Sequence, residues 1–127
     1  YEILPYYNSI FMDIVCETWH EGQCFLPNEK TGRPIIARTP FIAYAGKDFL
    51  KNLKKLGFKT FDRWWSEEYD DHEGVQRIQY MLKEIKKISR YPVDRLKEIQ
   101  QEMMPVLEHN YKIIKSLTPE QMLEKFK

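Results

Sequence analysis

The sequence predicts an α/β fold in which a small, mostly parallel Rossmann-like sheet carries a helical carboxyl-terminal extension. Two short apolar runs, at residues 10–16 and 40–45, have the length and composition of buried strands. The second run leads into an amphipathic helix and then into another apolar segment, an alternation typical of α/β proteins. From residue 75 onward the apolar residues recur at helical spacing. We therefore expect a Rossmann-like half-domain over residues 1–90 and a helical extension over residues 91–127, both in one compact unit.

The first half of the predicted sheet follows an irregular lead-in over residues 1–9. Residues 10–16 (IFMDIVC) predict a buried strand that is interrupted only by Asp13. The polar segment 17–32 contains Gly and Pro and indicates a loop, with the start of a helix near Asn28. A short helix is expected over residues 31–38 with Pro34 in its first turn, where the missing N–H removes no hydrogen bond.

The second half of the predicted sheet begins with residues 40–45 (PFIAYA), a further buried strand. A helix is expected over residues 47–56 because its four large apolar residues share one face, and Gly57 is suited to cap its carboxyl end. Residues 58–61 then predict a third short strand or extended piece.

The remainder predicts helices. One apolar stripe marks an amphipathic helix that ends near Arg90, because the residue before Pro92 disfavours helical geometry. A second helix begins at Pro92, and Pro105 is expected to kink or split it before another helical segment follows. A last short helix is expected over residues 119–126. The stripe of the first helix consists of Val75, Ile78, Leu82, Ile85 and Ile88.

Composition and charge narrow the function classes. The 127 residues are 43% hydrophobic and 31% charged, which fits one globular domain. Twenty basic and nineteen acidic side chains leave a net charge of +1, so we expect no general attraction to nucleic acid. Apolar runs fall far short of the roughly 20 residues that a membrane helix needs, so no membrane partner is expected. Two cysteines form no disulfide framework, which favours a reducing, cytoplasmic setting.

The loop after the first strand is the main candidate site. Ligands of α/β folds bind beyond the carboxyl ends of the strands, and this loop leads there. Glu29 beside Lys30, at the entry to a helix, suits a nucleotide: a carboxylate accepts hydrogen bonds from ribose hydroxyls, while Lys and helix N–H groups face phosphate. The alternative is an exposed charge pair on a surface loop.

Four other groups favour a structural role over a chemical one. The acidic segment 67–73 has oxygen ligands but no spaced metal motif, so we expect a solvated loop before a helix. Cys16, His20 and Cys24 lack a fourth zinc ligand, and Cys16 is expected to be a buried strand residue. Of Trp64 and Trp65, one is expected to be buried and the other partly exposed. A basic helix face is expected to be solvated rather than bound to nucleic acid, and it consists of Lys47, Lys51, Lys54, Lys55 and Lys59.

Residues 10–90 resemble the carboxyl-terminal half of GT-B glycosyltransferases, especially phage and bacterial enzymes related to the fucosyltransferases. The resemblance lies in IVCETWHEGQCFLPNEKTGRPIIARTPFIAYAGKDFLKNLKKLGFKTF and in the later WWSEEYDDHEGVQRI. In that family a strand ends in an acidic residue, a Ser/Thr-Glu-Lys motif follows in a loop, and a helix leads to a Pro-initiated strand. The Trp, Glu, Tyr-Asp and Arg-Ile pattern then comes after a Gly-Phe sequence.

The resemblance implies that Glu29 binds the ribose and Lys30 the diphosphate of a GDP- or UDP-sugar, with Glu17 and Thr18 lining the donor pocket. Asn28 stands where the family has Ser or Thr before the Glu-Lys pair. The family implies no metal and no cofactor besides the donor substrate.

A complete GT-B enzyme has two Rossmann-like domains, and 127 residues supply at most one. The chain begins at Tyr1 without an initiator Met or a signal segment, so we expect a part of a longer protein with an amino-terminal domain elsewhere. No catalytic residue is assigned. The alternative function is a noncatalytic assembly module that forms homo-oligomers through its helical tail.

Overall fold

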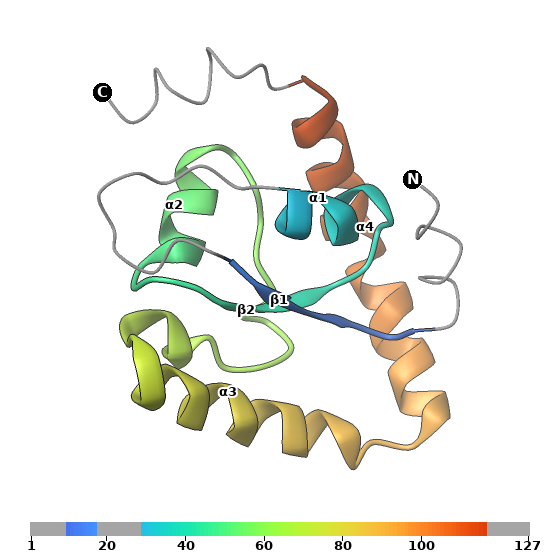
Figure 1. The fold of residues 1–127 in the computed structure, drawn as a ribbon. Helices are drawn as coiled ribbons and strands as arrows, with labels where there is room; N and C mark the ends of the chain where they lie inside the picture. Colours follow the sequence, from blue (N-terminus) through green and yellow to red (C-terminus); the bar gives the residue numbers. More distant parts are fainter. Residues whose placement is uncertain (1–9, 18–28, 117–127) are drawn as a thin grey trace.

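A parallel pair of strands with helices on both faces forms the centre of the protein. The computed structural model describes residues 10–17 and 29–116 (Figure 1). Strand β1 (Asp13–Cys16) lies beside strand β2 (Phe41–Tyr44), and helix α1 (Glu29–Ile36) precedes β2. The pairing is parallel, with Asp13 opposite Phe41 and Cys16 opposite Tyr44. The predicted α/β class, the two strands and their parallel direction are therefore confirmed.

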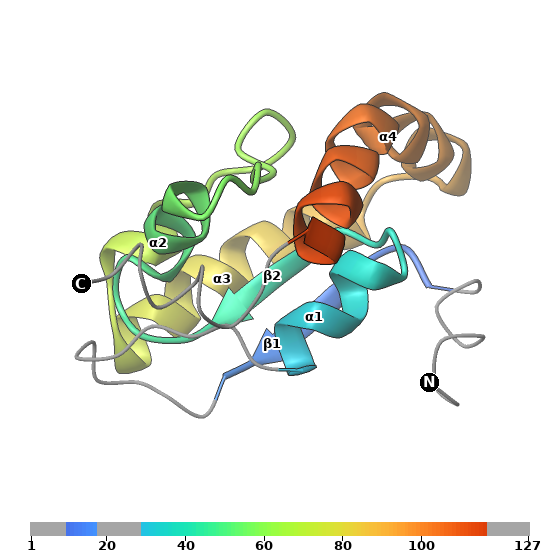
Figure 2. The same cartoon turned by 90° about the horizontal axis from the view of Figure 1, so that it is seen from above.

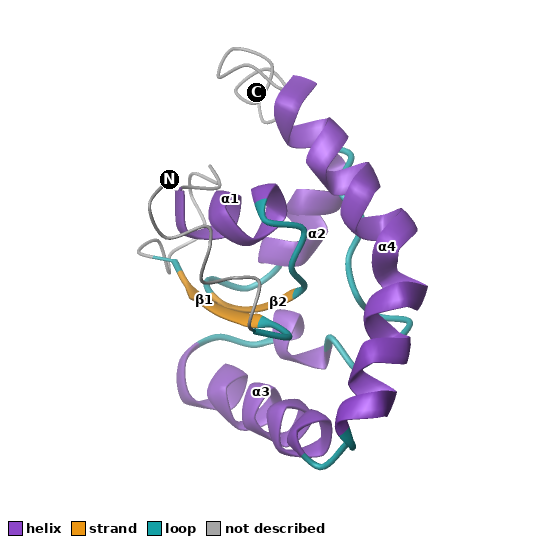
Figure 3. Ribbon diagram, turned by 90° about the vertical axis from the view of Figure 1, so that its right-hand side faces the viewer, coloured by secondary structure: helices purple, strands orange, loops and turns teal. Residues whose placement is uncertain are grey.

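The helices form a layer on each face of this sheet and a border along its side. Helix α1 lies over one face and helix α3 (Gly74–Ser89) under the other (Figure 1). Helix α2 (Phe49–Lys55) follows β2, and helix α4 (Val93–Ser116) runs from the α3 layer up to α1 (Figure 3). Seen from above, the carboxyl-terminal part of α4 lies next to α1, in agreement with the contacts between the two helices (Figure 2). The helical extension thus packs against its own sheet domain.

Strand β1 buries only one of its faces. Val15 is 2% exposed, whereas Ile14 is 49% exposed and Cys16 is also exposed. Side chains alternate between the two faces of a strand, and only the Val15 face is covered. The prediction that Cys16 is a buried strand residue is therefore wrong. β2, which pairs with β1 on one side and contacts α3, is buried at Phe41, Ile42 and Ala43.

Residues 58–61 form no strand, so of the two predicted alternatives, a short strand or an extended piece, the strand is wrong. Backbone groups of Lys59 and Phe61 bind side chains instead of a neighbouring strand. The Asn110 side chain accepts a hydrogen bond from Lys59 N at 2.8 Å and donates one to Lys59 O at 2.9 Å. The Phe61 N–H donates to Glu67 Oε2 at 3.1 Å. This segment is therefore an irregular connection in which side chains of Asn110 and Glu67 satisfy backbone groups of Lys59 and Phe61.

Helix α1 begins at Glu29, in agreement with the predicted start near Asn28, and ends at Ile36. Pro34 lies inside it rather than in the first turn, so that detail of the prediction is wrong. The early start moves Pro34 past the first turn, and its ring nitrogen lacks the proton for one helical hydrogen bond. The chain then leaves the helix through Arg38, which has a left-handed φ of 53°.

Helix α2 ends as the sequence predicts. Gly57 has a φ of 104°, a conformation that costs glycine little. Its N–H donates to Lys54 O at 3.0 Å, and Phe58 N donates to Leu53 O at 3.2 Å. These two bonds form a Schellman motif, which satisfies carbonyls of the last turn.

Helix α3 has the predicted bounds but turns a different face to the core. The inward residues, all of them buried, are Arg77, Met81, Glu84 and Ile88. Most of the predicted apolar stripe is exposed, because two polar residues of α3 lie on the inward face instead. Both form hydrogen bonds there: Glu84 Oε1 accepts from Ser66 N at 2.9 Å, and Arg77 donates to several backbone carbonyls. The exposed members of the stripe are Val75, Ile78 and Leu82.

Helix α4 continues through Pro105 as a single helix, so of the two predicted effects of this proline, a kink or a split, the split is wrong. Pro105 is exposed on its outer side, while Ile99, Met103 and Leu107 pack into the core. Arg38 links the end of α1 to α4 through an ion pair with Glu108. The predicted helix over residues 119–126 lies outside the described residues. Within the described residues, none of the helices combines the length and the apolar character that crossing a bilayer requires.

Candidate functional site

The carboxyl ends of the two parallel strands meet at one edge of the sheet, where ligands of α/β proteins bind. β1 runs into Glu17, and β2 runs through Ala45 into Gly46. The backbone keeps the strands together one residue past β1, because Glu17 N donates to Tyr44 O at 2.9 Å. This edge contains two clusters of polar residues, one after each strand.

The first cluster joins Glu17 to the first turn of α1. Glu17 is 3% exposed, and its carboxylate accepts a hydrogen bond from the hydroxyl of Thr31, which is completely buried. Glu29 and Lys30 are the two residues before Thr31 and open the helix. The structure therefore brings Glu17 to the turn that carries the Glu-Lys pair. Thr18 and Asn28 lie outside the described residues.

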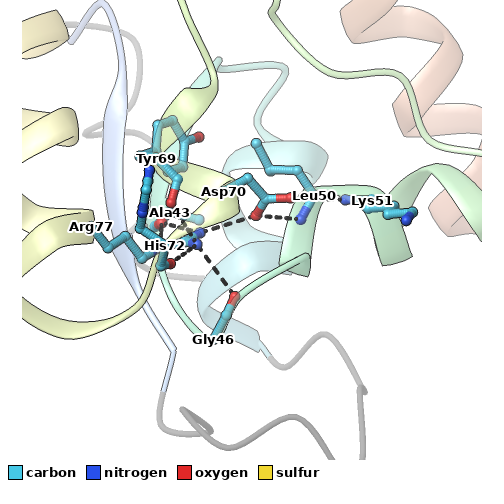
Figure 4. Close-up of polar contacts among 8 residues, drawn as sticks. All are labelled: Ala43, Gly46, Leu50, Lys51, Tyr69, Asp70, His72 and Arg77. Carbon is cyan, nitrogen blue, oxygen red and sulfur yellow. Dashed lines mark hydrogen bonds and ion pairs between the residues drawn. The ribbon is translucent and has the colours of Figure 1, made fainter.

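The second cluster is centred on Arg77, whose side chain is completely buried (Figure 4). Its Nε and Nη2 donate to Ala43 O at 3.0 and 2.8 Å. Its Nη1 donates to Gly46 O, Tyr69 O and His72 O over 3.1 to 3.3 Å. Burial lowers the pKa of the guanidinium, and the nearby carboxylate of Asp70 opposes this effect. Arg77 thus ties the end of β2 to the segment that precedes α3.

Asp70 extends this cluster to helix α2. Its Oδ1 forms the ion pair with Arg77 Nη2 at 3.2 Å and also accepts from Leu50 N at 2.9 Å. Its Oδ2 accepts from Lys51 N at 3.2 Å (Figure 4). A carboxylate at this position satisfies free N–H groups of the first turn and complements the helix dipole. The amino terminus of α2 is therefore occupied by a side chain of the protein itself.

The acidic segment 67–73 is only partly solvated, which corrects the prediction of a solvated loop. Asp70 lies in the 3-10 helix η2 (Glu68–Asp71) and is 8% exposed. Burial raises the pKa of Glu67 to about 7 although its carboxylate accepts a hydrogen bond from the Phe61 N–H. Glu68, Asp71 and Glu73 are exposed, as the prediction requires. Residues 10–17 and 29–116 contain no group of three or more side chains arranged to hold a metal ion.

Two hollows lie beside this acidic segment. The smaller, of about 270 Å³, lies over the first turn of α2, and Lys51, Glu67 and Asp70 are among its lining residues. The larger, of about 750 Å³, lies between α3 and residues 66–69. Its cationic residues are Lys83, Lys86, Lys87 and Arg90. Neither hollow contains Glu17, so the predicted donor residues and these hollows are separate places.

The two tryptophans agree with their prediction. Trp65 is 4% exposed and packs on Phe61, with ring centres 5.7 Å apart. Trp64 is half-buried and donates from Nε1 to Glu102 Oε1 at 3.0 Å. The five lysines of the predicted basic face are exposed, as expected of a solvated helix face. His20 and Cys24 lie outside the described residues.

The Trp, Glu, Tyr-Asp and Arg-Ile pattern of residues 64–78 includes the residues of the Arg77 cluster, but it does not predict their contacts. Tyr69-Asp70 and Arg77-Ile78 are its Tyr-Asp and Arg-Ile elements, and the structure joins them through the buried ion pair. Thr31 and Glu84 were missed. The available signal was the position of Arg77 and Glu84 seven residues apart on one side of an otherwise amphipathic helix.

Comparisons with protein-family models, with curated proteins and with solved structures found no match for this chain. The candidate function therefore depends on the residues and their geometry, together with the family resemblance of the sequence.

Proposed function

We propose that this chain is the nucleotide-sugar donor-binding half of a glycosyltransferase, part of a longer cytoplasmic enzyme of GT-B type. The observation that carries the proposal is the hydrogen bond between Thr31 and Glu17. It holds the first turn of α1, with Glu29 and Lys30, at the carboxyl end of β1. A parallel strand, a polar loop and a helix amino terminus in this order form the usual setting for a bound nucleotide.

In this proposal the donor binds over the first turn of α1. Glu29 accepts hydrogen bonds from the two ribose hydroxyls, and Lys30 pairs with the diphosphate. The helix N–H groups and the positive end of the dipole add to the attraction for phosphate. The amino terminus of α2 is unsuited to the same role, because Asp70 already accepts from Leu50 N and Lys51 N. The described geometry thus favours α1 over α2 as the phosphate-binding helix.

The chemical contribution of this half is electrostatic. Negative charge develops on the departing nucleoside diphosphate, and cationic and N–H groups that are already oriented toward it stabilise the transition state. The acceptor and any general base belong to the second domain of the proposed enzyme. We therefore expect the isolated chain to bind its donor without turnover.

The test is calorimetric titration of GDP, UDP and their sugar conjugates into the chain. We expect micromolar binding of one nucleotide, and at least about tenfold weaker binding after Glu29→Ala or Lys30→Ala, because each removes a charged hydrogen bond. Lys55→Ala, which changes an exposed lysine at the end of α2, is the matched control and leaves the affinity unchanged. Absence of binding by every nucleotide, or equal effects of all three substitutions, would contradict the proposal.

A noncatalytic assembly module is the second candidate, and the exposed apolar residues of α3 favour it. The predicted route through the helical tail has less support, because Ile99, Met103 and Leu107 of α4 are buried against the chain itself. Light scattering combined with the calorimetric titration separates the two functions. A module that only assembles forms oligomers regardless of nucleotide and binds none, whereas a donor-binding domain binds one nucleotide whatever its oligomeric state.

A further inference from the structure

The exposed apolar residues of α3 have the spacing of a coiled-coil seam. Val75, Ile78 and Leu82 are 71%, 39% and 46% exposed, and the half-buried Ile85 continues the stripe. Intervals of three, four and three residues are those of alternating a and d positions. The core of the protein uses mainly the face of α3 that carries Met81 and Ile88. Ile85 lies at the border of this face and packs partly against the core, whereas Val75, Ile78 and Leu82 are exposed and available for a partner.

Exposed acidic and basic residues are separated along the axis of α3, counting the residues just before and just after the helix. Two exposed acidic residues, Asp71 and Glu73, come just before the first residue of α3. Exposed cations lie in the carboxyl-terminal half, at Lys83, Lys86, Lys87 and Arg90. Two such helices side by side in parallel would bring like charges together. In the antiparallel orientation each acidic end lies beside a basic end, which favours this pairing.

We propose that α3 pairs with α3 of a second copy of this chain, antiparallel about a two-fold axis. The seam is self-complementary in this orientation: Val75 lies opposite Ile85 of the second copy, and Ile78 opposite Leu82. A two-fold interface requires such a patch, because each copy presents the same residues to the other. The seam covers only about two heptads, so the dimer is of micromolar rather than nanomolar affinity.

This interface is independent of the donor site. α1 and α3 lie on opposite faces of the sheet (Figure 1), so a nucleotide at α1 and a second copy at α3 do not compete. Failure of nucleotide binding leaves the dimer proposal intact, and the reverse also holds.

The first test is sedimentation of the 127-residue chain over a range of concentrations. We expect a reversible dimer, and Leu82→Glu weakens it at least about 10-fold because a charge enters the apolar seam. The control is Val93→Glu, at a residue that is 66% exposed on α4, and it leaves the dimer unchanged. Circular dichroism and urea unfolding verify that both variants are folded. The proposal is overturned if the wild type is monomeric at every concentration, which would mean that the seam binds a different protein. Equal effects of the two substitutions also overturn it.

The second test measures orientation. In a chain whose Cys16 and Cys24 are replaced by Ser, Ile78→Cys and Leu82→Cys proteins of different mass are mixed and oxidised. Antiparallel pairing places these two positions opposite each other, so the mixed disulfide dominates over either symmetric one. Predominance of the symmetric disulfides indicates parallel helices and overturns the proposed arrangement, and so does the absence of any disulfide.

Discussion

Arg77 and Asp70 form an ion pair in which the guanidinium is completely buried and the carboxylate also binds the amino terminus of a helix. The pair joins four elements, since Arg77 extends from α3 to the carbonyls of β2 and η2, while Asp70 bonds α2. The Arg77 guanidinium and the Asp70 carboxylate each form several hydrogen bonds, so removing either side chain leaves buried polar groups without partners. The position of α2 relative to the sheet is therefore fixed by polar contacts as well as by apolar packing.

Replacement of Arg77 by Met tests the importance of this cluster. Arg77→Met leaves Asp70 as a buried charge without its partner and leaves the carbonyl of Ala43 without donors, so we expect unfolding to require about 3–5 kcal/mol less free energy. Urea unfolding followed by circular dichroism measures the change. Arg95→Met is the control, because Arg95 pairs with Glu98 and Glu102 on the exposed face of α4 and its loss is expected to leave the unfolding midpoint unchanged. A midpoint for Arg77→Met equal to that of Arg95→Met would contradict the prediction.

Glu67 makes the stability depend on pH near neutrality. Burial raises its pKa in the folded protein to about 7 from an ordinary value of 4.5. Between these two values the folded state retains a proton that the unfolded state has lost, so stability falls as the pH rises from about 4.5 to about 7, by on the order of 3 kcal/mol in total. The measurement is the free energy of unfolding in urea at each pH.

Glu67→Gln is the variant that isolates this effect. The amide oxygen still accepts from Phe61 N, but the side chain no longer titrates. The stability difference between the variant and the wild type is therefore expected to grow in favour of the variant across this pH range. Parallel pH profiles for the two proteins would show that Glu67 does not titrate as stated.

The side chain of Asn110 forms hydrogen bonds with the backbone of Lys59 that a neighbouring strand would otherwise form. Asn110→Ala leaves the partly buried N–H and C=O of Lys59 without their hydrogen bonds, and we expect a loss of about 1–3 kcal/mol in unfolding free energy. His109→Ala is the neighbouring control. The His109 ring contacts Gly57 O at 2.7 Å from an exposed position, so its loss is expected to cost less than about 1 kcal/mol. Equal losses for the two variants would mean that the Asn110 contacts have no special role.

Two glycines are expected to respond in opposite directions to the same substitution. Gly57→Ala puts a side chain at a φ of 104°, which we expect to cost about 1 kcal/mol or more. Gly32→Ala lies within α1, where the added methyl group would meet Ile114 Cδ1 at an ordinary 3.6 Å. It is expected to stabilise the protein by up to about 1 kcal/mol through helix propensity. Thermal unfolding of both variants checks the two signs, and a shift in the same direction would refute this account.

Local sequence signals predict the elements of the fold but not which of their faces is buried. The apolar runs locate β1 and β2, and Gly57 locates the end of α2, because composition and backbone freedom are properties of a few neighbouring residues. Periodicity gives the bounds of α3 yet misleads about its inner face, since Arg77 is buried through carbonyls of residues 43 and 46. These carbonyls lie more than 30 residues from Arg77 in the sequence, so no local pattern predicts the contact.

The same limit applies to the candidate site. The Glu-Lys pair is predicted from its position after a strand, and Glu17 from the family resemblance. The structure adds Thr31, which follows the pair in the chain and donates a hydrogen bond to Glu17. A third strand is one of the two predicted alternatives for residues 58–61, the other being an extended piece, because these residues have strand-like composition. It fails because Asn110, 51 residues from Lys59, supplies hydrogen bonds that a strand neighbour would otherwise provide.

The contact between Asn110 and Lys59 also determines when this protein can fold during its synthesis. The two residues are 51 positions apart, and the sheet and α2 are translated long before α4. Until residue 110 has left the ribosome, the backbone of Lys59 has no partner and the apolar residues that α4 covers stay in water. Incomplete chains that end before α4 are therefore expected to expose apolar surface and to need chaperones, and this domain completes its folding only after α4 has been synthesised.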